Sequence, residues 1–178
     1  MNDFGIVTEA GAIRFERLLP GPMERVWAYL TDADKRGKWL ATGAVQPWVG
    51  GNVELHFRHA DLSPHKEEIP EKYRQCENGA SFTAEVTRCE PPSLLSHTWA
   101  DGSEVTFELT AQGEGVLLVL THRRLTATEM LSVAGGWHAH LGILVDHLNG
   151  RTPQPFWSTH ARLEAAYEPR IAASLSVP

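Results

Sequence analysis

The feature that most constrains the fold of this chain is a run of short alternating segments between residues 52 and 123. In residues 53–59, 82–86 and 105–109, every second residue is apolar or carries a ring, as in strands with one buried face. Turn-forming stretches separate the segments, for example "AQGEG" at 111–115. Because consecutive strands with short connections pair with their neighbours, these residues predict an antiparallel meander.

A long amphipathic segment follows the meander, over residues 130–149. A helix of this length spans about 30 Å, and Gly150 stands where a C-cap belongs. The polar face carries no lysine or arginine, unlike a membrane-surface helix, and the sheet needs an apolar cover. We therefore expect a core helix whose apolar stripe consists of Met130, Val133, Trp137, Leu141, Leu144 and Leu148.

The residues before the meander predict one strand and two short helices. Residues 12–20 alternate like a strand, and residues 22–30 have helical spacing with Pro22 at a first helical position. A second short helix follows, and Gly37 should end it. Residues 60–79 lack any period and mix prolines with charges, so we expect a long mobile loop of the kind that often forms a lid.

Five stretches jointly carry a resemblance to a known family: "PMERVWAYLTDADKRGKWL", "VGGNVELHFRH", "EVTRCEPPSLLSHTW", "FELTAQGEGVLLVLTHRRL" and "GGWHAHLGILVDHLNG". They strongly resemble the START-like (SRPBCC) superfamily, in the bacterial branch named after activators of a heat-shock-protein ATPase. The resemblance covers residues 12–150 and implies an α+β helix-grip fold. In that fold a curved antiparallel sheet wraps around a long C-terminal helix, often with an apolar cavity between them. We expect residues 1–150 to form this domain and residues 151–178 to add a linker and an extra C-terminal helix.

The C-terminal tail, residues 151–178, begins with the stiff linker "RTPQP". Phe156, Leu163 and Tyr167 then follow at helical spacing, and we expect Pro169 to end this helix because proline disrupts a helix interior. So short a helix is marginal alone, so its stripe must pack on its own domain or on a second copy. Apolar appendages often meet in two-fold dimers, and we expect a homodimer with the tail at or near the contact.

Composition and charge exclude several function classes. The net charge is −6, whereas a nucleic-acid partner would favour a basic face. No apolar run approaches the roughly 18 residues that span a bilayer. The first residues, "MNDFGIVTEAG", have no basic or apolar region of a signal peptide, so we expect a cytoplasmic protein without a membrane or nucleic-acid partner.

The motifs of common catalytic and metal sites are also missing from the sequence. There is no HExxH, CxxC or GxSxG, and Cys76 and Cys89 have no activating neighbours. His140 and His147 lie two helical turns apart, about 10 Å, which is too far for one zinc ion. We therefore expect no metal and no cofactor, and we assign no catalytic residue.

Two histidines stand on rows that face the predicted core. His59 ends the inward row of residues 53–57, and His122 extends the row of Val116, Leu118 and Leu120. Each is either a rim residue turned outward or a polar anchor at the mouth of an apolar pocket. Together with inward-facing or loop-adjacent apolar residues they make the candidate ligand site: Trp39, Phe57, His59, Phe82, Trp99, Phe107, His122, Trp137 and Leu141.

These residues and the resemblance together lead to three hypotheses of function. The first is binding of a small apolar or amphipathic ligand in a cavity between the sheet and the long helix. The second is a cyclase-like or hydrolase-like enzyme that uses His59 or His122 as a general acid or base. The third, which the family name suggests, is a chaperone-interacting domain. A buried histidine hydrogen-bonded to a carboxylate would favour the enzyme.

Overall fold

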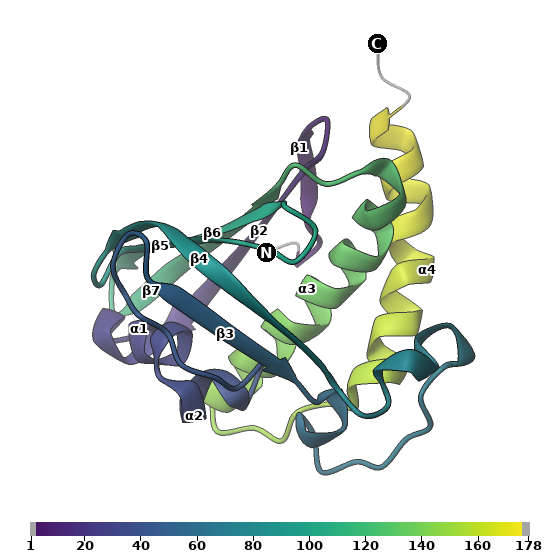
Figure 1. Cartoon of the computed structure of the whole chain (residues 1–178), viewed down its shortest axis with the longest axis horizontal. Coiled ribbons are helices and arrows are strands. Elements are labelled where there is room, and N and C mark those ends of the chain that lie inside the picture. Colours follow the sequence, from purple (N-terminus) through teal and green to yellow (C-terminus); the bar gives the residue numbers. More distant parts are fainter. Residues whose placement is uncertain (1–2, 176–178) are drawn as a thin grey trace.

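The computed structural model describes residues 3–175, which form one antiparallel sheet and two long helices (Figure 1). The strands are β1 (Ile6–Glu9), β2 (Ala12–Pro20), β3 (Asn52–Phe57), β4 (Ala80–Glu90), β5 (Leu94–Thr98), β6 (Glu104–Gln112) and β7 (Gly115–Arg123). The helices are α1 (Met23–Thr31), α2 (Ala33–Gly37), α3 (Ala127–Leu148) and α4 (Phe156–Leu175), and two 3-10 turns are η1 (His59–Asp61) and η2 (Glu71–Cys76).

The sheet confirms the predicted meander and the helix-grip fold. Its strand order within the described residues is β1-β2-β7-β6-β5-β4-β3, and every neighbouring pair is antiparallel. The curved sheet wraps around α3, and α4 lies alongside α3 on the side away from the sheet (Figure 1). The short strand β1, which the sequence patterns did not predict, extends the sheet beyond β2.

The predicted faces of the strands are also confirmed. In β3, Val53, Leu55 and Phe57 are buried, whereas the residues between them are exposed. In β6, Val105, Phe107 and Leu109 are buried, and Thr106 between the first two is buried as well. A one-residue shift of register would have placed these side chains in solvent, so the alternation identified the correct face. Among residues 3–175, no helix is both long enough and apolar enough to cross a membrane.

The core helix α3 starts three residues earlier than the apolar stripe predicted. Thr126 and Glu129 form a capping box, in which each side chain hydrogen-bonds the backbone N–H of the other residue. The stripe itself is buried, with Val133 only partly so. Leu144 of the stripe is 0% exposed, and a second side of the helix, toward the tail, is buried as well, since Ile143 is only 4% exposed.

Truncation of either residue should therefore be costly. We expect Leu144→Ala to lower the free energy of unfolding by roughly 2–5 kcal/mol, since it leaves a cavity under the sheet. Ile143→Ala should fall in the same range because Ile143 is buried on the side toward the tail, although the single stripe in the sequence would rank it well below Leu144. Urea denaturation of the wild type and of the two variants measures both losses. A midpoint for Ile143→Ala close to that of the wild type would mean that α4 is not held on α3 in solution.

The tail forms a longer helix than the sequence predicts. Pro169 does not end α4, which continues to Leu175 with the proline inside it. Proline removes one backbone hydrogen bond and crowds the preceding turn. The buried side chains of Tyr167 and Ile171, one on each side of Pro169, hold both flanking turns against the rest of the molecule, and this packing offsets the cost.

The apolar stripe of the tail is buried within its own chain. Phe156, Trp157, Leu163 and Tyr167 are each no more than 4% exposed. The sequence left two surfaces open for this stripe, its own domain or a second copy. In the structure the tail packs on its own domain, so the stripe gives no reason to expect a partner copy. The homodimer stays a prediction without that support, and the boundary between a domain of residues 1–150 and an extension of residues 151–178 stays a prediction too.

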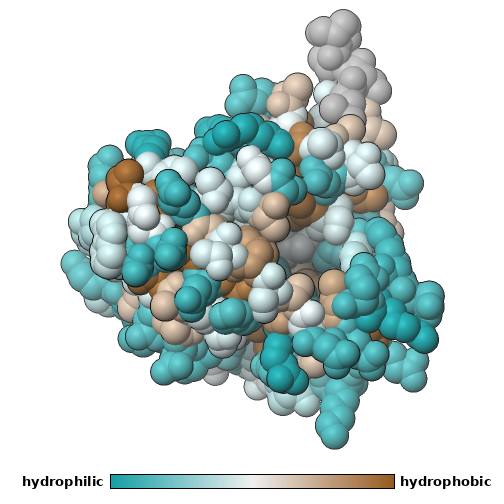
Figure 2. All heavy atoms as spheres, viewed as in Figure 1, coloured by the Kyte–Doolittle hydropathy of each residue, from teal (hydrophilic) through white to brown (hydrophobic). Residues whose placement is uncertain are grey.

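The segment predicted as a long mobile loop contains η2 and is fastened to the tail. The Glu67 carboxylate accepts hydrogen bonds from the backbone N–H groups of Trp157 (2.6 Å) and Ser158 (2.9 Å), at the N-terminus of α4. The Tyr73 hydroxyl donates to the Glu164 carboxylate over 2.7 Å. The loop presents mainly hydrophilic side chains to solvent, at the lower right of the view (Figure 2). Loop and tail therefore form one unit over the end of the sheet.

Candidate ligand-binding cavity

A cavity of about 270 Å³ lies where the loop and the start of α4 meet α3, the end of β3 and the start of β4. Six of the predicted site residues line it: Phe57, His59, Phe82, Trp99, His122 and Trp137. The alternation of β3 and β4 aims Phe57 and Phe82 at the space, and the stripe of α3 supplies Trp137. The remaining lining residues are Leu40, Tyr73, Cys76, Ala80, Ser132, Val133, Gly136, His140, Phe156, Trp157 and His160.

Three predicted site residues lie in the solid core beside the cavity and do not line it. Trp39 is fully buried, its indole N–H donates to the Tyr29 carbonyl (2.8 Å), and its ring meets that of Phe107 edge to face. Leu141 is fully buried in the hydrophobic core. The inward direction of these side chains was correct, but the sheet and α3 pack directly together there and leave no open space.

The sequence patterns missed the wall that the loop and tail provide. Tyr73 comes from η2, and Phe156, Trp157 and His160 come from the first turns of α4. The helical spacing of Phe156 and His160 marked an apolar stripe, but no local pattern showed where that stripe would dock. The stacked rings of Tyr73 and Trp157, 5.2 Å apart, join the two segments at the cavity.

His122 lines the cavity, and both of its ring nitrogens are engaged by other residues of the protein. The Trp137 indole N–H donates to Nδ1 (2.9 Å), which places the proton of the neutral ring on Nε2. Nε2–H then donates to the Ser103 hydroxyl (2.6 Å), and that hydroxyl donates to the Asp101 carboxylate. Burial lowers the pKa of His122 to about 4, so the ring is neutral near pH 7.

This arrangement leaves His122 without a free nitrogen for acid–base chemistry. Burial alone would raise the pKa of Asp101, but the hydrogen bonds from Ser103 outweigh it and lower that pKa, so Asp101 stays a carboxylate. Within residues 3–175 no buried histidine hydrogen-bonds a carboxylate directly, since Ser103 stands between this pair and His160 Nδ1 lies 4.0 Å from Glu164. The observation that would favour an enzyme is therefore missing from this part of the chain.

A second group of histidines lies at the loop-and-tail end of the cavity. The ring centroids of His59 and His140 are 5.4 Å apart, and Phe156 lies 4.3 Å from His59. His140 Nδ1–H donates to the Trp39 carbonyl (2.7 Å), and burial lowers its pKa to about 3. Burial, and then His160, lower the pKa of His59 to about 4. All of these rings are neutral near pH 7.

Three polar atoms at this end of the cavity have no hydrogen-bond partner among the residues that the structure describes. They are Nδ1 of His59, Nδ1 of His160 and Nε1 of Trp157. Buried polar atoms of this kind are unusual and costly, and they occur here on three residues that line one cavity. In the same part of the chain, no group of three or more histidine, cysteine or acidic side chains is arranged to hold a metal ion.

Residues 20–149 match a protein family with the description "Activator of Hsp90 ATPase homolog 1-like protein". The chain belongs to this family. It is 50% identical to a protein of Bordetella parapertussis with a solution NMR structure, over 95% of this chain and 91% of that one, with a TM-score of 0.80. Among curated proteins there is no match.

More distant solved structures share the fold of this AHSA1-like protein. CalU16 from Micromonospora echinospora is 22% identical, covers 90% of this chain and 88% of its own, and has a TM-score of 0.65. A protein of unknown function from Enterococcus faecalis is 20% identical, covers 97% and 92%, and has a TM-score of 0.68. These two structures show the same fold as this chain. The family match ends at residue 149, so the cavity wall formed by Phe156, Trp157 and His160 lies outside it.

Proposed function

We propose that this AHSA1-like protein binds a small, uncharged, largely aromatic molecule in the cavity between the sheet, α3 and α4. One observation carries the proposal: eleven of the seventeen lining residues carry an aromatic or imidazole ring, and none is Asp, Glu, Lys or Arg. A planar ligand gains edge and face contacts with such rings beyond the burial of its area. An aliphatic chain gains the burial alone, and a charged group would be buried without a counter-charge.

The ring contacts in the lining, one buried donor and the volume of the cavity support the same kind of ligand. Phe57 stacks on Phe82 at 5.9 Å, and Trp99 is tilted against Trp137 at 5.4 Å, so these residues already make ring-to-ring contacts of both kinds there. The indole N–H of Trp157 has no partner among the described residues, and in the proposed complex it donates to an acceptor atom of the ligand. At about 270 Å³ the cavity is at the small end of ligand pockets, which favours a compact ligand of few rings.

Calorimetric titration with 1-naphthol and 1-octanol tests the proposal. We expect 1-naphthol to bind more tightly, because 1-octanol lacks ring contacts with the lining. Equal affinity for 1-octanol and 1-naphthol would contradict an aromatic site.

Two glycines of α3 provide a matched pair of variants for that titration. A Cβ at Gly136 would meet only His160 Nε2, at 3.9 Å, so the side chain of Gly136→Met should grow into the cavity and abolish binding of 1-naphthol. Gly142 lies on the same helix outside this cavity, and Gly142→Met should leave the affinity unchanged. Unchanged binding by Gly136→Met would show that the ligand sits elsewhere.

A further inference from the structure

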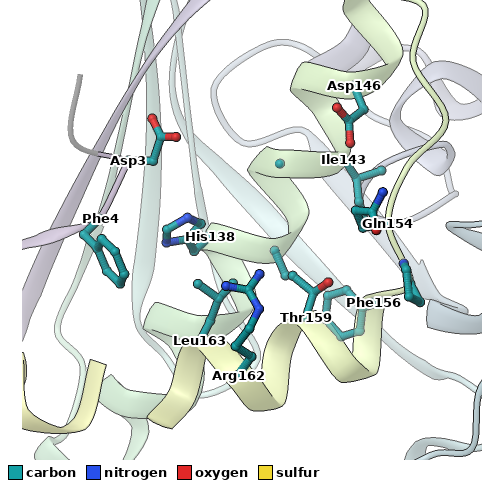
Figure 3. Close-up of a pocket in the computed structure, with 13 residues that line it drawn as sticks. Asp3, Phe4, His138, Ile143, Asp146, Gln154, Phe156, Thr159, Arg162 and Leu163 are labelled. Carbon is teal, nitrogen blue, oxygen red and sulfur yellow. The ribbon is translucent and has the colours of Figure 1, made fainter. Parts of the chain in front are cut away.

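A second hollow lies on the other side of α3, between α3, α4 and the N-terminal segment (Figure 3). Its volume is about 400 Å³, and an adjoining hollow of about 410 Å³ shares Asp3, His138, Gly142 and Asp146 with it. We call the two together the seam groove. The tail, from Gln154 to Leu163, forms one wall of the larger hollow. This hollow therefore exists only because the tail packs on its own domain.

The seam groove has an apolar part and a charged part. Phe4, Ile143 and Leu163 supply apolar surface, and His138 and Arg162 enter the same space from α3 and α4 (Figure 3). This division differs from the first cavity, whose lining carries no charged side chain. A molecule that fits the seam groove is therefore amphipathic.

The charges of the seam groove sum to an excess of one positive charge. Its guanidinium groups are Arg17, Arg151 and Arg162, against the carboxylates of Asp3 and Asp146. Asp146 is already paired with Arg151 at 2.9 Å. Within residues 3–175 Arg162 forms no ion pair or hydrogen bond. Arg17 is only 5% exposed, and its Nη2 has no hydrogen-bond partner there. Nη1 of Arg17 donates to the Glu16 carbonyl (2.7 Å), so Nη2 is the buried donor that lacks an acceptor, and an anion in the groove would supply one.

Within the described residues, His138 is hydrogen-bonded through Nδ1. The Tyr167 hydroxyl accepts from the Gly5 N–H (2.6 Å) and is hydrogen-bonded to His138 Nδ1 (2.9 Å). In the tautomer that leaves Nε2 as a donor, the Tyr167 proton is donated to Nδ1 and the neutral ring carries its hydrogen on Nε2. Burial, and then Arg17, lower the pKa of His138 to about 4, so the ring is neutral near pH 7.

Gly142 keeps the seam groove open at a cost to the helix. A glycine inside a helix is less favourable than alanine, and here a Cβ would meet nothing within 4 Å. Gly135 is different, because a Cβ there would lie 3.1 Å from Glu164 Cγ, so close packing of α4 explains that glycine. Packing does not explain Gly142, but an occupant of the hollow above it would.

We infer that the seam groove is a second binding site, for a small amphipathic molecule with one carboxylate. The carboxylate would accept hydrogen bonds from Arg162 and from Nε2–H of His138, within the excess positive charge. The alkyl or aryl body would lie on Phe4, Ile143 and Leu163, above the open position at Gly142. This ligand is distinct from that of the first cavity by its charge.

NMR titration of the ¹⁵N-labelled full chain with octanoate, 1-octanol and octylammonium tests the inference. Octanoate should shift the amides of Gly142 and Arg162 saturably and leave that of Gly136 unchanged, and it should bind at least about tenfold more tightly than the other two, the ratio expected for a hydrogen-bonded charge. Absence of saturable shifts at millimolar octanoate would overturn the second site. Shifts centred on Trp99 would overturn it as well, because they would place octanoate in the first cavity.

Variants separate recognition of the carboxylate from general effects on the fold. Arg162→Gln should weaken octanoate at least about tenfold, whereas Arg88→Gln, which removes the same charge from the outer face of β4, should not. Gly142→Met should abolish octanoate binding and leave 1-naphthol binding intact. Gly142→Ala should melt at a higher temperature than the wild type and still weaken the binding of octanoate. It therefore serves as a folded variant even if Gly142→Met does not fold. Unchanged octanoate affinity in Arg162→Gln contradicts the assignment.

Discussion

Between pH 6.5 and pH 5 the protein is expected to lose most of its stability. Burial lowers the pKa of His97 and His122 to about 4 and that of His140 to about 3. An unfolded chain takes up these protons near pH 6.5, so acid favours the unfolded state. Stability is complete above pH 6.5 and falls as the pH drops toward 4. At pH 5 each ring accounts for about 2 kcal/mol, and three such losses approach the whole stability of an ordinary domain.

Urea denaturation followed by circular dichroism between pH 7.5 and pH 4.5 measures this loss. His97→Phe should flatten the dependence on pH, because the new ring fits between Trp99 and Phe107, whose centroids lie 5.9 and 6.1 Å from that of His97. His65→Ala, at an exposed position, should follow the wild-type curve. If His97→Phe and the wild type lose stability in parallel, or if neither loses any by pH 5, the buried histidines do not control acid unfolding.

The parts of the fold that could be predicted from the sequence are those with a local period. Alternation in residues 53–57 and 105–109 identified the buried face of two strands, since a side-chain period of two leaves only one choice of face. Steps of three and four did the same for α3. The resemblance to the SRPBCC superfamily then added the wrapping of the sheet around this helix, which no single period contains.

The candidate site could be predicted only on the side that these periods describe. Phe82, Trp99 and Trp137 line the cavity as expected. The opposite wall depends on contacts between residues about 90 positions apart, such as Glu67 with the N-terminus of α4 and Tyr73 with Glu164. No local pattern records such contacts. A period also gives the direction of a side chain and not the space in front of it.

Buried charges are the other feature that the sequence patterns could not show, and Arg36 is the clearest case. In the sequence it looks like an ordinary basic residue in the last turn of a short helix. In the structure it is 3% exposed and donates hydrogen bonds to the carbonyl groups of Ala41 (3.0 Å), Thr42 (3.1 Å), Gly43 (2.9 Å) and Glu54. Burial lowers its pKa to about 10, opposed by Glu54, so it remains charged near pH 7.

Replacing Arg36 should be among the most destabilising single changes in the protein. The segment that it holds, residues 41–45, covers the outer edge of β3 through the bridges of Thr42 with His56 and of Val45 with Val53. Arg36→Met would leave four carbonyl groups without this donor and release the edge strand. We expect a loss of about 3–5 kcal/mol in the free energy of unfolding and a tendency to aggregate through the exposed edge.

Urea denaturation and light scattering test this expectation against Lys35→Met, which removes the same charge from an exposed neighbour in α2 and should change stability by less than about 1 kcal/mol. Arg36→Lys should lie between the two, because an ammonium group keeps the charge but cannot reach four carbonyl groups from one planar fork. If Arg36→Met were as stable as Lys35→Met, the guanidinium would not be what holds residues 41–45 on β3. The edge would then depend on its two backbone bridges alone.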